Sequence, residues 1–138
     1  MKGKLIILFF VLMPTTVLAQ EIYSMSIEEF YQVEENKNMY SFLEKNGKVD
    51  EAREMLKINC LKQAKEEAEK EYCKCMGPII DRADGKMIVY DSVVSYKSFL
   101  AEVRAKQSGN EDEYLRLRQL DAKREGLSKQ YEKYCGKI

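Results

Sequence analysis

Apolar side chains recur at intervals of three and four residues along most of this chain of 138 residues, and no other feature constrains its fold as strongly. A helix that is buried along one side needs this spacing, whereas a half-buried strand needs strict alternation of apolar and polar residues. The pattern is most regular near the C-terminus, where a heptad-like seam runs from Leu117 to Tyr134. The sequence therefore predicts an all-α fold.

Capping and helix-ending residues set the limits of the first half of the fold. Ser26 begins a capping-box pattern, and Asn46-Gly47 has the composition of a helix end. The first helix is expected between these positions, kinked or split near Asn36. A second helical segment is predicted from about residue 49 to 75, and Gly77-Pro78 is expected to stop or kink it.

The second half of the chain predicts two further helices. Asp84-Gly85 is typical of a turn, and residues 86–90 are expected as an extended or helical lead-in to a helix over about 91–107. Asn110 is a suitable cap for a fourth helix. Together the segments predict a small helical bundle of about four helices. The side chains expected to face the core from the third helix are Val93, Tyr96, Leu100 and Val103.

The first 19 residues have the pattern of a cleavable signal peptide. Two lysines precede an apolar run from Leu5 to Met13, and Ala19 ends a stretch with the small residues of a cleavage site. The apolar run is shorter than the roughly 20 residues that a membrane-spanning helix needs. We therefore expect a signal peptide over residues 1–19 and a single helical domain over residues 20–138, in a periplasmic or secreted protein.

Four cysteines in an exported chain are expected to form disulfides, and geometry ranks the pairings. Cys60 and Cys73 would lie about 20 Å apart on one straight helix, too far for a bond. In an up-down arrangement Cys135 ends near Cys73 and Cys75, so a bond from Cys135 to one of that pair is expected. The other two cysteines then either bond across a broken segment 49–75, which we favour, or remain free.

The closely spaced Cys73 and Cys75 also support a different interpretation, in which they carry thiol-disulfide redox chemistry. Lys70 and Lys74 would favour the thiolate form, whereas a position near the end of a helix would disfavour it. Four cysteines can also hold zinc, although exported thiols tend to oxidise. Structural disulfides are the favoured interpretation of all four cysteines.

The composition argues against most other chemistry. The chain has no histidine, which is the commonest general base and metal ligand. Paired carboxylates such as Glu66-Glu67 are neighbours on predicted helices, so they point apart rather than across a cleft. Basic and acidic residues, 23 of each, are interspersed and do not form the basic face that nucleic acid needs. We therefore predict no catalytic residue, no metal and no cofactor.

Nine tyrosines are spread over the predicted helices, and tyrosine is enriched in protein interfaces because it combines a large contact area with a polar tip. Most of these rings are expected to fill the rims of the helix packing. The tyrosines near the acidic first helix are the best candidates for an exposed contact surface. The predicted partner-contact residues are Tyr23, Tyr31, Glu34, Glu35 and Tyr40.

These observations favour an exported, non-enzymatic protein that binds another exported protein, as an inhibitor, an immunity protein or an envelope accessory factor would. Neither nucleic-acid binding nor stable membrane insertion after signal cleavage is expected. The alternative is a redox protein that uses Cys73 and Cys75. A third possibility is a carrier that holds a small ligand between its helices.

Overall fold

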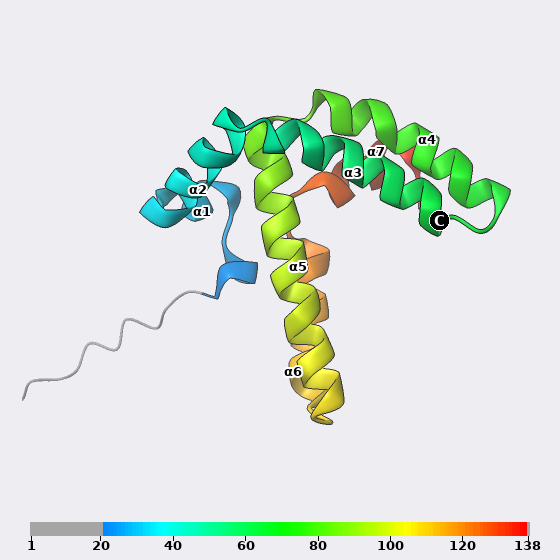
Figure 1. Cartoon of the computed structure of the whole chain (residues 1–138). Coiled ribbons are helices and arrows are strands. Elements are labelled where there is room, and N and C mark those ends of the chain that lie inside the picture. Colours follow the sequence, from blue (N-terminus) through cyan, green and yellow to red (C-terminus); the bar gives the residue numbers. More distant parts are fainter. Residues whose placement is uncertain (1–20, 138) are drawn as a thin grey trace, which may run out of the picture.

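The computed structural model describes residues 21–137, which form seven α-helices and one short 3-10 helix (Figure 1). The predicted signal peptide over residues 1–19 lies outside the described residues. Within them the all-α prediction is confirmed. In chain order the elements are η1 (Ile22–Ser24), α1 (Ile27–Gln32), α2 (Glu34–Lys45), α3 (Lys48–Gln63), α4 (Glu67–Arg82), α5 (Gly85–Gln107), α6 (Glu111–Lys123) and α7 (Leu127–Cys135).

The prediction of about four helices is wrong, because three of the expected segments are divided. The first segment breaks at Val33, between α1 and α2, a few residues before the predicted position. The second breaks at residues 64–66, between α3 and α4. The last breaks at residues 124–126, between α6 and α7. Each break lets the chain fold back on itself instead of continuing as one long rod.

A local hydrogen-bond exchange explains how α4 begins without a glycine or proline. The carboxylate of Glu69 accepts the backbone N–H groups of Lys65 and Glu66, at 2.5 and 3.1 Å. The Glu66 side chain accepts in return from the backbone of Glu69, which completes a capping box. These bonds satisfy donors that would otherwise be unpaired at the start of a helix.

Pro78 lies inside α4 and does not stop it. A proline in a helix removes one backbone hydrogen bond, at a cost of about 3 kcal/mol. The helix nevertheless continues for another turn, to Arg82, and places Ile80 at 0% exposure in the core. Burial of such a side chain contributes about 1.5–3 kcal/mol, which offsets much of the cost.

The longest helix, α5, is the axis around which the other helices are arranged (Figure 1). The next helix, α6, returns alongside it, so the two form one arm of the molecule. The α3/α4 hairpin projects sideways from the start of α5 as a second arm, with α7 packed against α4. On the other side, α1 and α2 pack against α5.

The core sits where these parts meet, in two adjacent clusters of buried side chains. Met39, Met87 and Val93 pack against both clusters and so connect them. The phenol of Tyr90 is fully buried, and its hydroxyl donates to the carbonyl oxygen of Met25 at 2.6 Å. The buried members of the clusters are Val49, Ile80, Ile88, Val89 and Leu127 in one, and Phe30, Tyr90 and Val94 in the other.

The α5/α6 arm is thin beyond this junction. Of its side chains from residue 96 to 123, those that are buried are Ser98, Ala105 and Leu117. Tyr96, expected to face the core, is 63% exposed. That expectation is wrong because α5 packs on α6 through a different face from the one that carries Tyr96.

Candidate functional site

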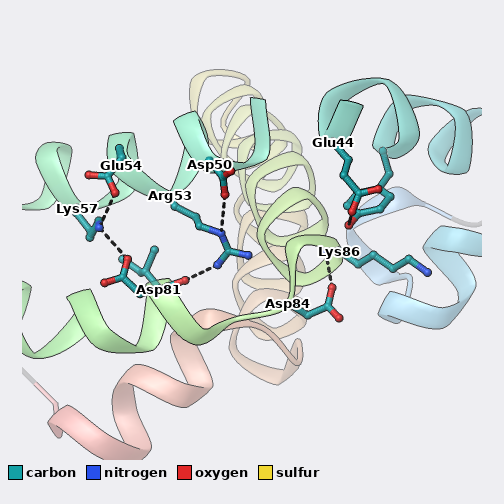
Figure 2. Close-up of polar contacts among 10 residues, drawn as sticks. Glu44, Asp50, Arg53, Glu54, Lys57, Asp81, Asp84 and Lys86 are labelled. Carbon is teal, nitrogen blue, oxygen red and sulfur yellow. Dashed lines mark hydrogen bonds and ion pairs between the residues drawn. The ribbon is translucent and has the colours of Figure 1, made fainter. Parts of the chain in front are cut away.

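A sharp corner between α4 and α5 organises the surface around it. Asp84 caps α5 and accepts the backbone N–H of Lys86 at 2.7 Å (Figure 2). Gly85 follows, and a Cβ at this position would lie 3.0 Å from the Tyr40 hydroxyl and 3.2 Å from a methyl group of Val49. A side chain here would push the Tyr40 hydroxyl or Val49 away by a few tenths of an ångström, so glycine suits this close approach of the corner to α2 and α3.

Two of the predicted contact tyrosines meet at this corner. The rings of Tyr31 and Tyr40 form an edge-to-face pair at 5.7 Å, and Nζ of Lys86 lies 5.6 and 5.9 Å from their centroids. The Tyr31 hydroxyl donates to the Lys86 carbonyl oxygen at 2.7 Å, and that of Tyr40 donates to Glu44 at 2.8 Å. Burial, and then the nearby carboxylate of Glu44, raises the pKa of Tyr40 to about 12. Burial likewise raises the pKa of Tyr31.

The other predicted contact residues are placed elsewhere. Tyr23 is half-buried, and its hydroxyl donates to Glu21, which pairs with Arg116 of α6 at 2.9 Å. Glu34 and Glu35 are exposed in the first turn of α2, and Glu34 pairs with the nearby Lys37. The structure thus brings Tyr31 and Tyr40 together with Lys86 but does not gather all five residues at one site. Their role as partner contacts stays a prediction.

A groove runs past the same corner from α1 to α7. Its three hollows, of about 550, 380 and 390 Å³, all have Met87 in their walls, and we call them together the Met87 groove. The largest hollow lies between α4 and α7 and is lined by Cys75, Pro78, Ile79, Arg82, Ala83, Asp84, Met87, Gln130 and Tyr134. The next extends toward Ile27 and Tyr31 of α1, and the third toward Lys129 and Lys133 of α7.

The Met87 groove combines an apolar floor with a polar rim. Ile79, Ala83 and Met87 supply apolar surface, and the flexible thioether of methionine adapts to ligands of different shape. Tyr134, 66% exposed, stands at one edge with Nζ of Lys133 at 5.1 Å from its ring centroid. Basic side chains outnumber acidic ones around the rim: Arg82, Lys86, Lys129 and Lys133 against Glu28, Asp84 and Glu125.

Two disulfides hold α4, and one of them joins two walls of this groove. Cys75 and Cys135, with Cα atoms 5.9 Å apart, join α4 to the end of α7, so the expected bond from Cys135 to one of the pair is made. Cys60 and Cys73, with Cα atoms 5.6 Å apart, join α3 to α4 across the hairpin that full bonding required. Sequence spacing alone could not choose between Cys73 and Cys75 as the partner of Cys135.

The bonding pattern also bears on the redox alternative. Cys73 and Cys75 each bond to a distant cysteine instead of to each other. Cys73 is buried, with 7% of its surface exposed, so little of this sulfur is open to an attacking thiol. The redox function stays a prediction, and this arrangement gives it no direct support.

The charged residues between α3 and α4 form a structural network (Figure 2). Arg53 donates to the carbonyl oxygen of Ile80 at 2.6 Å and lies 3.7 Å from Asp50. Lys57 pairs with Asp81 and Glu54, each at 2.7 Å, and the hydrogen bond to Asp81 raises the pKa of Lys57. These contacts tie α3 to the last turn of α4, where carbonyl groups lack partners within the helix.

Within residues 21–137 no three His, Cys, Asp or Glu side chains are grouped as a metal site would require. In the same part of the chain no helix is both long and apolar enough to cross a bilayer. Comparison of the chain with protein-family models, curated proteins and solved structures finds no match. The function is therefore argued from the Met87 groove itself.

Proposed function

We propose that this protein is exported and acts by binding another protein, a segment of which lies in the Met87 groove. The observation that carries the proposal is the continuity of the three hollows along α1, the start of α5, and α7. An open strip with an apolar floor and a polar rim suits a peptide segment, since apolar anchors supply binding energy and rim groups fix orientation.

The stapled walls support the same proposal. Binding costs less when the groove is already formed, because fewer side chains and loops have to be ordered. The Cys75–Cys135 bond holds α7 against α4, and both helices line the largest hollow. Two disulfides are also consistent with a protein that folds in an oxidising compartment, as export predicts.

Photo-crosslinking in the cells that make the protein tests the proposal. A photoreactive p-benzoylphenylalanine in place of Gln130, which lines two of the hollows, is expected to give one discrete protein adduct. The same group in place of Gln119, exposed on α6, is expected to give none. Equal adducts from both positions, or none from Gln130, would contradict the proposal.

Matched substitutions test whether the Met87 groove makes the contact with the partner protein. Tyr134→Ala together with Arg82→Ala is expected to lower the adduct yield about tenfold or more, because truncating interface anchors commonly costs about 2 kcal/mol. Phe42→Ala is the control, since Phe42 is as exposed as Tyr134, at 64%, but does not line the groove. An adduct that survives the groove substitutions would place the partner elsewhere.

A further inference from the structure

An apolar stripe runs along one side of α5. Its members are Tyr96, Phe99, Leu100 and Val103, which we call the α5 stripe. Their spacing of three, four and seven residues puts them on one helix face. Tyr96 and Phe99, at the middle of α5, are 63% and 59% exposed. A helix normally turns such a face toward a partner element.

The rest of the molecule leaves Tyr96 and Phe99 exposed and covers Leu100 and Val103 only in part. The buried residues of this half of α5 are Ser98 and Ala105, which lie about half a helical turn away from the stripe and pack toward α6. In Figure 1 α5 lies in front of α6, so the side of α5 that faces away from α6 has no helix over it. The α5 stripe therefore resembles the buried side of an interface.

Charge limits what can cover the α5 stripe. Lys97 and Arg104, seven residues apart, border it on one side, and neither makes an ion pair within residues 21–137. Glu102, an acid of the same stretch of α5, is paired with Arg118 of α6 at 3.6 Å. Two α5 stripes packed against each other would bring these cations together, which is unfavourable. The complementary surface has to be apolar and acidic.

The outer side of α3 has this character. A shallow hollow of about 440 Å³ is lined by Gly47, Asp50, Glu51, Glu54 and Met55, and we call it the α3 hollow. The side chain of Met55 is 51% exposed, and the exposed Ile58 and Leu61 continue the apolar surface along α3. Glu51 pairs with the exposed Lys48, and such a pair contributes little and exchanges readily. Glu54, itself 64% exposed, shares Lys57 with Asp81.

We propose that the α5 stripe docks into the α3 hollow of a second copy of this chain. The two surfaces lie on different arms of the molecule (Figure 1). The two copies are related by a two-fold axis. The α5 stripe of each copy then contacts the α3 hollow of the other, which gives a closed dimer with two equivalent contacts. Lys97 and Arg104 then face the acids of the hollow, and the Met87 groove is not part of the contact.

Charge reversal in the full, disulfide-bonded protein tests this dimer. Sedimentation velocity over a range of concentrations is expected to show a monomer–dimer equilibrium for the unmodified chain. A variant with Lys97→Glu and Arg104→Glu, and a second with Glu51→Lys and Glu54→Lys, are each expected to dimerise at least about tenfold more weakly, since like charges then meet. All four side chains are exposed, and Lys57 keeps its pair with Asp81 when Glu54 is replaced, so both variants are expected to fold, which matched thermal unfolding curves check.

Mixing the two variants gives the decisive result. The first carries acids on both surfaces and the second carries bases on both, so together they are expected to restore a one-to-one dimer. Leu115→Glu, at a residue 49% exposed on α6, is the control that leaves dimerisation unchanged. A chain that stays monomeric at every concentration, reversals without effect, or a mixture that stays monomeric would each overturn the proposal. Tyr134→Ala with Arg82→Ala is expected to leave the dimer intact, which separates it from the groove.

Discussion

At the scale of single residues, Asp91 has the most unusual environment of the carboxylates. One of its oxygens accepts the backbone N–H of Leu127 at 3.3 Å, at the start of α7. Burial raises the pKa of Asp91 above its usual value of 3.8, while the nearby Arg124 and the bond from Leu127 oppose the shift. The folded state thus holds a proton on Asp91 more tightly than the unfolded state does.

The direction of this pKa shift determines how the stability of the protein changes with pH. Where the folded pKa is the higher one, the free energy of unfolding falls as pH rises through the two pKa values. Asp91→Asn keeps the oxygen acceptor for Leu127 and removes the charge. We expect the stability of Asp91→Asn relative to the unmodified protein to rise from about pH 4 to pH 7. Urea unfolding across this range measures it, and Asp112→Asn, on the exposed start of α6, is the control.

Gly126 is confined by the same carboxylate. A Cβ on Gly126 would collide with an oxygen of Asp91, which cannot move away without losing its bond to Leu127. Gly126→Ala is therefore expected to lower the free energy of unfolding by about 1–3 kcal/mol, as overpacking does. Gly77→Ala is the matched control in α4, where the nearest atom is 3.9 Å away on Lys57. At that position the better helix propensity of alanine is opposed by the contact of its Cβ with the Pro78 ring, so the control is expected to change stability by less than about 1 kcal/mol, and equal losses would contradict the argument.

At the scale of elements, the two disulfides are expected to differ in their effect. The Cys75–Cys135 bond spans 60 residues and the Cys60–Cys73 bond spans 13. In the chain-entropy model the longer loop stabilises by about 4 kcal/mol and the shorter by about 3 kcal/mol. Replacing Cys75 and Cys135 by Ala is thus expected to lower the urea midpoint more than replacing Cys60 and Cys73. The reverse order would show that strain or residual structure outweighs loop closure.

The helical nature of the chain was predictable from sequence, but the places where the helices break were only partly so. The capping box at Ser26 and the cap at Asn110 are both formed. The break at residues 64–66 could be inferred only from the need to bond Cys60, because the sequence there has no helix breaker. The break before Leu127 left a signal, Gly126, in the middle of an otherwise regular seam.

The candidate site was harder to predict than the fold. The Asp84-Gly85 turn was recognised, but nothing in the local pattern shows that Met87 would line a groove as well as pack against the core. Its position depends on α7 folding back along α4, a contact between residues about 50 apart in the chain. The α5 stripe is the opposite case, because its pattern predicts a face turned toward the core, whereas Tyr96 and Phe99 are 63% and 59% exposed.

At the scale of the whole molecule, the two arms should differ in stability along their length. Both core clusters lie at the junction, and the outer half of the α5/α6 arm buries few side chains. Native-state hydrogen exchange, at concentrations low enough for monomer, is expected to be slowest for amides of residues 88–94 and much faster for residues 104–115. Uniform protection along α5 would show that the arm is stabilised by contacts other than the junction.

The placement of both disulfides on α4 also determines how the molecule carries a mechanical load. If the chain is pulled from its two ends, tension passes from Cys60 across to Cys73, through Lys74 to Cys75, and then directly to Cys135. Residues 61–72 and 76–134 lie outside this path and bear no force while the bonds are intact. The stretched molecule would therefore unravel α1, α2 and most of α3, while the largest hollow of the Met87 groove, built from residues between Cys75 and Cys135, would be shielded from the pull.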